Sequence, residues 1–213
     1  MRVRVAKVLF SRAGAGGDSS SPQPLGGYRK RAIDLAIASI ALVLLTPIMV
    51  IVAVLIRLLF GRPIFVVQQL IGFRGRALAG YEFRTTLFRE RGRPPAAARV
   101  LLGWRQQPAA LLVESALCSS GLDKLPLLFN VLRGDMSLVG PRPIAADELI
   151  CYRVQAPEYF GARPGIIGIW QHADRNLITY AKRTALDRYY IRHWSVTLDC
   201  ALLIKSVLAS FRD

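Results

Sequence analysis

The longest feature in the pattern of hydrophobic and polar positions is a run from Leu35 to Ile56 that contains no charged residue. About 20 apolar residues are enough for a helix to cross a bilayer. Thr46-Pro47 lies near the middle of the run, where a proline removes a backbone donor and clashes with the preceding turn. We therefore predict a membrane helix over 28–60 that is kinked at Thr46-Pro47, with the Thr46 hydroxyl bonding a carbonyl that the kink exposes.

Basic residues flank this run on both sides. They are Arg29, Lys30 and Arg31 before it, and Arg57 and Arg62 after it. A spanning helix usually has its basic flank on the cytoplasmic side alone. Symmetric flanks therefore favour a re-entrant helix, which bends and returns to the cytoplasmic face. A plain transmembrane helix that tolerates its proline is the alternative.

Asp34 is a carboxylate one turn inside the start of the helix. A charge at this depth needs a partner of opposite sign, and both Lys30 and Arg31 are within one helical turn. Asp34 either favours the helix start through the helix dipole or ties the membrane helix to the soluble part of the protein. Both interpretations give it a structural role.

The rest of the pattern predicts shorter elements. Residues 1–27 have no apolar period and become rich in Gly, Ala, Ser and Pro, so we predict a disordered tail. Between 61 and 86, β-branched and aromatic residues punctuated by glycines predict short strands joined by turns. We predict helices over 101–117 and 126–132, and a loop over 92–98.

From Asp187 on, apolar residues again recur at helical spacing. They are Trp194, Leu198, Ala201, Leu202 and Leu208, with Arg192, Lys205 and Arg212 near the polar side. We predict one amphipathic C-terminal helix, which lies either in the headgroup layer or on the protein's own core. The predicted fold is thus mainly α with small β or extended segments. In it, a re-entrant membrane helix and interfacial amphipathic helices surround a small cytosolic domain over 61–213.

The composition of the chain indicates an anionic binding partner. The 213 residues suffice for one domain, and 53% of them are hydrophobic, which is high for a soluble domain. Lys and Arg number 29 against 14 Asp and Glu. A chain that is both apolar and basic indicates anionic lipid, phosphorylated ligands or nucleic acid. Because no nucleic-acid-binding motif is visible, we expect no nucleic acid partner.

The cysteines and histidines add no catalytic or metal site. Cys118, Cys151 and Cys200 are far apart and form no CxxC pair, so we interpret them as reduced thiols, which suit a cytosolic compartment. His172 and His193 are also scattered, and we expect both to be structural.

Most candidate catalytic and phosphate-binding residues lie in one segment, Gly121–Pro143, with the sequence GLDKLPLLFNVLRGDMSLVGPRP. This segment resembles the central motif of the monotopic phosphoglycosyl transferases, also called bacterial sugar transferases. Further matches occur in the family's order along the chain. They are Arg31–Leu35, Gly61–Phe65 followed by Gln68 or Gln69, Phe83–Thr85, Arg163–Gly168 with Gln171, and Leu186–Tyr190. The resemblance extends from about Tyr28 to the end of the chain.

The resemblance implies a fold, a reaction and a place in the cell. The family has a re-entrant helix kinked at a Ser-Pro pair, which Thr46-Pro47 matches, and amphipathic helices on the inner leaflet. It transfers a phosphosugar from a nucleotide diphosphate sugar, usually a UDP-sugar, to polyprenyl phosphate. The implied location is the cytoplasmic face of the bacterial inner membrane, in contact with anionic lipid. A second copy of the chain and polysaccharide-assembly proteins are further candidate partners.

The resemblance also implies residue roles. The family reacts through an aspartyl-phosphosugar intermediate with Mg²⁺, and Asp123 falls on the position of the nucleophile and metal ligand. Arg142, between two prolines that fix its backbone, and Arg163, before Pro164-Gly165, are candidate phosphate clamps, and Arg84 is a third phosphate-binding candidate. Supporting positions are Asp135, Pro141, Pro143, Gln171 and Asp187. The structural alternatives are a helix N-cap for Asp123 and surface salt bridges for Arg142 and Arg163.

One departure from the family falls directly at the nucleophile. The family usually has Asp-Glu there, whereas this chain has Asp123-Lys124. An ammonium group repels Mg²⁺, but Lys124 can instead stabilise the Asp123 carboxylate or a phosphate directly, which makes it a second catalytic candidate. The stretch 93–120 also lacks the family's usual pattern. Two functions stay open: an active transferase, and a catalytically impaired homologue that binds lipid, nucleotide sugar or an assembly partner.

Overall fold

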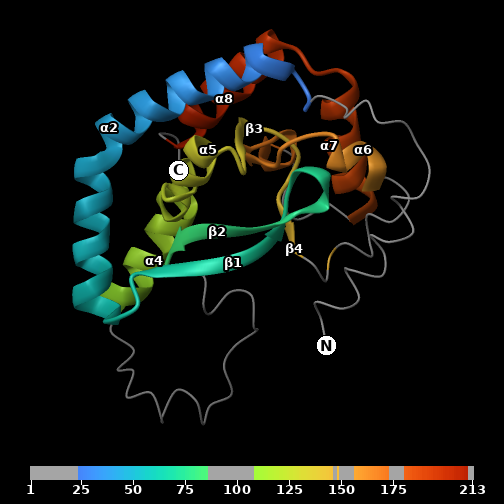
Figure 1. The fold of residues 1–213 in the computed structure, drawn as a ribbon. Helices are drawn as coiled ribbons and strands as arrows, with labels where there is room; N and C mark the ends of the chain where they lie inside the picture. The colour runs from blue at the N-terminus through green and yellow to red at the C-terminus, as the bar shows by residue number, and fades with distance from the viewer. Residues whose placement is uncertain (1–23, 86–107, 146–147, 149–155, 173–179, 211–213) are drawn as a thin grey trace.

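The computed structural model describes residues 24–85, 108–145, 148, 156–172 and 180–210. The fold is mainly helical with two small sheets, as the sequence predicts (Figure 1). In chain order the elements are α2 (Gly27–Phe60), β1 (Phe65–Ile71), η1 (Phe73–Gly75), β2 (Ala77–Phe83), α4 (Pro108–Ser120), η3 (Leu122–Lys124), α5 (Leu127–Arg133), β3 (Ser137–Val139), β4 (Ile144–Ala145), α6 (Ala156–Phe160), β5 (Gly165–Ile167), η5 (Ile169–His172), α7 (Tyr180–Arg192) and α8 (Val196–Ser210).

The long helix α2 begins slightly before the predicted boundary. It starts at Gly27, and Leu25 already packs against the core and donates its backbone N–H to the Gly161 carbonyl at 3.1 Å. The predicted tail over 1–27 is therefore wrong for its last residues, 24–27. Its remaining part, 1–23, and the predicted loop over 92–98 lie outside the described residues.

Helix α2 is continuous through Thr46 and Pro47, and its ribbon curves around the rest of the molecule (Figure 1). The Thr46 hydroxyl donates to the Leu42 carbonyl at 2.5 Å. Proline lacks the N–H that would bond the carbonyl four residues earlier, which belongs to Val43. Thr46 thus bonds a neighbour of the carbonyl that Pro47 leaves unbonded. The kink and the re-entrant path stay predictions.

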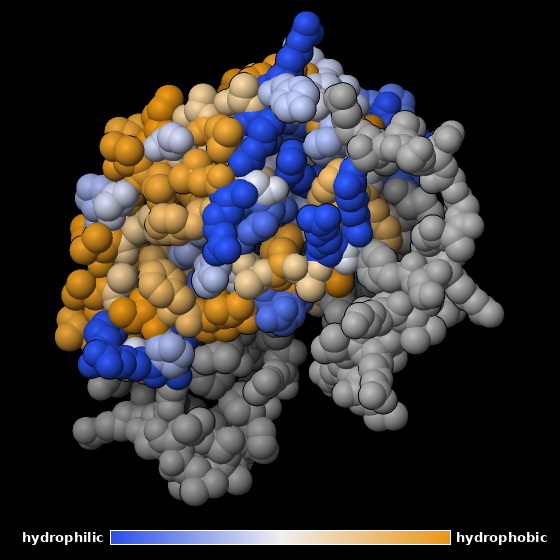
Figure 2. All heavy atoms as spheres, viewed as in Figure 1, coloured by the Kyte–Doolittle hydropathy of each residue, from blue (hydrophilic) through white to orange (hydrophobic). Residues whose placement is uncertain are grey.

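Two faces of α2 have different environments. The buried positions recur at helical spacing and are Lys30, Asp34, Ala38, Met49, Val52 and Ile56. The exposed large apolar side chains are Ile40, Val43, Leu44, Ile48, Val50, Ile51, Val54, Leu55 and Leu58. Figure 2 shows the apolar surface along the side of the molecule that α2 occupies. By length and composition α2 can cross or insert into a membrane.

The first sheet has the strand order β2-β1-β4. Strands β1 and β2 form an antiparallel hairpin, with pairs from Phe65–Phe83 to Ile71–Ala77, and β4 adds to the other edge of β1. These strands confirm the prediction for 61–86. The hairpin turn contains η1, where Gly75 has φ +68°, a conformation that glycine adopts without steric cost.

The second sheet pairs β3 and β5 in parallel. Just past β3, the backbone of Gly140 touches the other strand so closely that a Cβ atom would lie 2.6 Å from the Arg163 carbonyl oxygen. Gly140 donates its N–H to Ile167, and Gly165 donates to the Pro141 carbonyl, both at 2.9 Å. This close crossing holds the non-helical Pro141–Pro143 segment beside the start of η5.

The C-terminal region contains two helices, so the prediction of one continuous helix from Asp187 on is wrong. Helix α7 ends at Arg192, and α8 begins at Val196. Ser195 caps α8, because its hydroxyl accepts the Leu198 N–H at 3.1 Å. Trp194, whose spacing suggested a helical position, lies in the connection and donates its indole N–H to Asp199 at 2.9 Å.

Two apolar clusters lie under α2. The first joins the beginning of α2 at Ala38 to α5, β3, α7 and α8, and contains Leu127, Val131, Met136 and Leu202. The second joins the end of α2, at Met49, Val52 and Ile56, to Phe83 and Leu117. The predicted helix over 126–132 is confirmed as α5, with Pro126 at its N-cap, and the described part of the helix predicted over 101–117 is α4.

Candidate active site

Asp123 and Lys124 lie on the short 3₁₀ helix η3, between α4 and α5. Gly121 ends α4 with φ +71°, which lets the chain turn sharply into η3. Leu122 and Leu125 pack into the apolar cluster beside Phe83 of β2. This packing buries Asp123, which is only 3% exposed, and leaves Lys124 half-buried. The candidate nucleophile is therefore held on a rigid turn and shielded from bulk water.

Trp170 of η5 contacts both Lys124 and Arg142. The Lys124 ammonium lies 5.6 Å from the centroid of the indole ring, and the Arg142 guanidinium carbon lies 5.8 Å from it. Cations over an aromatic face are attracted by the ring quadrupole. Sequence reasoning missed Trp170, although it stands between Gly168 and Gln171 of a motif that had been singled out. A ring contact between three distant segments leaves no pattern in the sequence.

The main chain of Arg142 is held from two sides. Its N–H donates to the buried Asp187 carboxylate at 3.0 Å, and its carbonyl accepts the Tyr159 hydroxyl at 2.6 Å. Burial raises the pKa of Tyr159, so this hydroxyl stays protonated and can donate. The structure thus places Asp187 as a support for the Arg142 backbone, beside the prolines that restrict it.

The Arg142 side chain has one partnered and one unpartnered side. Its Nη2 donates to Glu148 at 3.2 Å. This ion pair is the kind of contact that the structural alternative for Arg142, a salt bridge, predicts. Its Nη1 is buried and makes no hydrogen bond to any residue that the structure describes. The guanidinium therefore keeps a donor available on the side away from Glu148.

Arg163 lies at the opposite end of α5 from Asp123. Its Nε donates to the Gly134 carbonyl at 3.0 Å, next to Arg31, which donates to Val131 at 2.7 Å. Seven residues of α-helix span about 10 Å. Burial and the neighbouring Arg31 lower the pKa of Arg163. The structure thus places the Arg163 side chain at the C-terminal end of α5.

Arg84 lies at the end of the long helix. Its Nη1 donates to the Phe60 carbonyl at 3.2 Å and to the Arg62 carbonyl at 2.8 Å. Burial lowers the pKa of Arg84. Because Arg84 directly follows β2, which packs against η3, it links the C-terminal end of α2 to the strand beside Asp123.

The remaining predicted residues lie in different parts of the site. Gln171 holds β5 and η5 together, donating to the Ile166 carbonyl at 3.0 Å and accepting the Gly168 N–H at 3.3 Å. Pro141 belongs to the crossing of β3 and β5, and Pro143 directly precedes β4. Asp135 makes a surface ion pair with Arg133 at 3.8 Å.

The described residues do not form a protein-held magnesium site. Among them, no three His, Cys, Asp or Glu side chains are grouped so that they could hold a metal ion. Mg²⁺ prefers oxygen ligands and is usually bound by one or two carboxylates together with substrate phosphates. Asp123 offers one carboxylate, and the residue that follows it is a cation. The donor set fits an anion better than a divalent cation.

Comparisons with known proteins agree with the motif. The family model described as bacterial sugar transferase matches residues 26–213. The exopolysaccharide production protein ExoY of Sinorhizobium fredii is 36% identical over 204 residues, which cover 90% of this chain and 89% of that protein. The undecaprenyl-phosphate galactose phosphotransferase of Salmonella typhimurium is 32% identical over 195 residues, 87% of this chain and 41% of that protein. A UDP-glucose:undecaprenyl-phosphate glucose-1-phosphate transferase of Caulobacter vibrioides is 33% identical over 194 residues, 87% of this chain and 71% of that protein. The chain therefore belongs to the bacterial sugar transferase family.

Proposed function

We propose that this protein transfers a phosphosugar from a nucleotide diphosphate sugar, with a UDP-sugar as the favoured donor, to polyprenyl phosphate. The product would start exopolysaccharide or glycoconjugate assembly. The observation that carries the proposal is the buried Asp123 carboxylate, held on η3 directly before Lys124, which is one of the two cations at Trp170. The names of the relatives, which specify undecaprenyl phosphate and UDP-glucose, support the same substrates.

The proposed reaction has two displacements at one phosphorus atom. First, an Asp123 carboxylate oxygen attacks the phosphorus that bears the sugar, and the bond from that phosphorus to the bridging oxygen breaks. UMP leaves with the bonding electron pair, and the phosphosugar is now joined to Asp123 as an acyl phosphate. Then an oxygen of polyprenyl phosphate attacks the same phosphorus and releases the Asp123 carboxylate. Splitting the transfer in this way replaces one difficult step by two easier ones.

Both displacements bring an anion toward a phosphate, so positive charge is needed at the site. Lys124 and Arg142 would supply it, because both lie at Trp170 and Arg142 keeps a buried donor without a described partner. The contacts of Arg84 and Arg163 with helix-terminal carbonyls support a positioning role for these two arginines. No step is assigned to Mg²⁺, which the family resemblance implies for the transfer reaction as a whole.

We further propose that α2 is re-entrant and that the rest of the chain lies on the cytoplasmic face of the inner membrane. The exposed apolar side chains of α2 support insertion. Tyr28, which is 86% exposed at the start of α2, is the kind of residue that anchors a helix at the headgroup level. Helix α8 has a second exposed apolar set, Val196, Ile204, Val207 and Leu208, which suits the interface of a bilayer containing anionic lipid.

The proposal is tested by measuring transfer of radiolabelled sugar phosphate from a panel of UDP-sugars to undecaprenyl phosphate in membranes containing this protein. Asp123→Asn should abolish transfer, because an amide cannot form the acyl phosphate. Glu114→Gln is the matched control, since it makes the same change of carboxylate to amide on α4. No transfer by the wild type from any UDP-sugar would favour the non-catalytic alternative.

A further inference from the structure

Two cations share one aromatic ring, and one of them, Lys124, directly follows the candidate nucleophile Asp123 on η3. Lys124 and Arg142 both lie within 6 Å of the centroid of Trp170. Charges of the same sign repel each other, and the indole quadrupole offsets only part of that repulsion. Glu148 neutralises one side of Arg142 at 3.2 Å. The arrangement of Lys124, Arg142 and Trp170, here called the Trp170 cradle, would gain most from a bound anion.

Two hydrogen-bond donors of the cradle have no partner among the described residues. They are Nη1 of Arg142 and Nε1 of Trp170, and both are buried. A buried donor that makes no hydrogen bond is unfavourable, because it has lost its water and gained nothing in return. Phosphate oxygens are hydrogen-bond acceptors of the kind that both donors lack. The cradle therefore offers charge and hydrogen bonds to the same kind of ligand.

We propose that the Trp170 cradle binds the diphosphate of a nucleoside diphosphate and neutralises it without requiring a divalent metal. Lys124 and Arg142 contact the phosphate oxygens. Trp170 is a positioning residue that holds both cations and adds one N–H donor. The inference rests on the proposed function. It makes Lys124, which stands where the motif of the family implies a glutamate, a phosphate ligand of this chain.

The test measures binding of UDP to the full chain in lipid nanodiscs by calorimetry, in buffer containing EDTA. The wild type should bind UDP under these conditions. Lys124→Gln and Arg142→Gln should each weaken binding about tenfold or more, the usual scale for a lost charge-assisted hydrogen bond. Lys182→Gln, which removes an exposed cation on α7, should leave the dissociation constant unchanged.

The positioning role of Trp170 is tested by a measurement that would not change if Trp170 had only a structural role. Trp170→Leu should weaken UDP binding about tenfold, and Trp170→Phe should recover part of the loss because the ring is kept. In the Trp170→Leu background, Lys124→Gln should cost much less than in the wild type, since the ammonium is no longer held in place. Fully additive effects of the two substitutions would contradict the positioning role.

Different results would overturn the proposed role of the Trp170 cradle and the proposed transferase function. Wild-type protein that binds UDP only when Mg²⁺ is added, while transferring sugar phosphate, would overturn the cradle and leave the transferase intact. Unchanged UDP affinity in Lys124→Gln would also overturn the cradle and leave the transferase function intact. Protein that binds UDP in EDTA through Lys124 and Arg142 but transfers nothing would overturn the proposed function and leave the cradle intact.

Discussion

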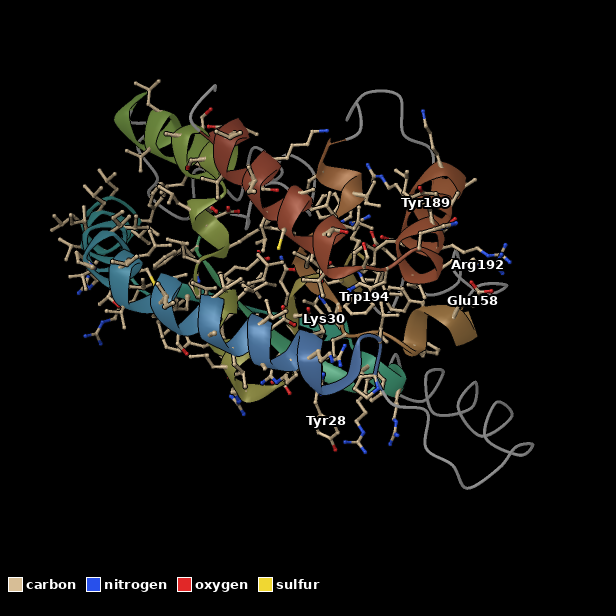
Figure 3. The ribbon with its side chains drawn as sticks, turned by 90° about the horizontal axis from the view of Figure 1, so that it is seen from above. Tyr28, Lys30, Glu158, Tyr189, Arg192 and Trp194 are labelled. Atoms are coloured by element: carbon tan, nitrogen blue, oxygen red, sulfur yellow. The ribbon has the colours of Figure 1, made fainter. Side chains whose placement is uncertain are left out.

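Lys30 and Asp199 form an ion pair at 2.6 Å although their side chains are only 7% and 12% exposed. The pair joins the first turn of α2 to α8. Asp199 also accepts hydrogen bonds from Tyr190 at 2.6 Å and from Trp194 at 2.9 Å. Figure 3 shows Lys30 and Trp194 close together where α2 meets the beginning of α8. A buried charge that is paired and hydrogen-bonded fixes the geometry of the two elements it joins.

Asp34 completes this connection one turn further along α2. It lies 3.9 Å from Lys30, accepts the Ser137 hydroxyl at 2.6 Å and accepts the Leu138 N–H at 3.3 Å. Of the two predicted partners, Lys30 is therefore the one that Asp34 meets. The hydrogen bonds to β3 show that Asp34 ties the membrane helix to the soluble part of the protein, which was one of the two interpretations.

Removing the ammonium from this network should be strongly destabilising. Lys30→Met leaves Asp34 and Asp199 buried without their cation, and breaking such a pair typically costs about 3–5 kcal/mol. Thermal unfolding in nanodiscs measures the loss. Arg29→Met is the control, because Arg29 is exposed on the same turn and should change stability by less than about 0.5 kcal/mol. A similar small effect for Lys30→Met would show that the pair is not needed.

The re-entrant path predicts that both ends of α2 face the cytoplasm. With the native cysteines replaced by serine, Tyr28→Cys and Arg62→Cys should both react with an impermeant thiol reagent only from the cytoplasmic side. Labelling of Tyr28→Cys from outside alone would establish a spanning helix. Pro47→Ala restores the missing backbone donor, so we expect it to straighten α2 and shift part of the population toward the spanning form.

Gly140 should tolerate no side chain, because of the close crossing of β3 and β5. In Gly140→Ala the new methyl group would meet the Arg163 carbonyl oxygen and, at 2.7 Å, the Gly165 nitrogen. Forcing atoms into a packed region typically costs about 1–3 kcal/mol. Gly121→Ala is the comparison, because Gly121 has a positive φ but open space around it. If Gly140→Ala is as stable as the wild type by thermal unfolding, the crossing is looser than described.

The ion pairs between α6 and α7 predict a dependence of stability on pH. Glu158 accepts from Arg192 at 2.7 Å and from Arg188 at 3.2 Å, and the hydrogen bond from Arg192 holds the pKa of Glu158 below its ordinary value. Figure 3 shows Glu158 and Arg192 facing each other across the two helices. A carboxylate with a lowered folded-state pKa stabilises the fold above its unfolded pKa, and this contribution is lost as the pH falls through the folded-state pKa.

We therefore expect the difference in stability between the wild type and Glu158→Gln to be present at pH 7 and to shrink as the pH falls below the ordinary pKa of glutamate. Added salt should also reduce the difference, because the pair is exposed to solvent. Unfolding curves recorded from pH 7 to pH 3 measure it. A difference that grows toward acidic pH would contradict the assignment.

Much of the fold could be predicted because its signals are local. The uncharged run determines α2, and the glycines and β-branched residues after it determine the β1–β2 hairpin. The two-helix C-terminus could not be read from apolar spacing. There the Ser195 cap and the bond from Trp194 to Asp199 end one helix and start the next, although the period of the pattern continues through them.

In the candidate site, too, the contacts between segments far apart in the chain could not be predicted from the sequence. The motif places Asp123 and Arg142 on non-helical or short segments, and the structure brings Lys124 and Arg142 to one ring. Sequence patterns indicated arginines suited to phosphate but did not indicate their partners. Arg163 and Arg84 meet carbonyls at the ends of α5 and α2, and these contacts depend on packing between segments far apart in the chain.

In the proposed reaction, Asp123 carries the phosphosugar between the two displacements. The most direct measurement mixes purified protein with the preferred UDP-sugar, labelled in the sugar, in the absence of polyprenyl phosphate. We expect rapid release of about one UMP per active chain, with the label bound to the protein, and neither event in Asp123→Asn. Release of UMP only when polyprenyl phosphate is present, or label bound equally to Asp123→Asn, would contradict it.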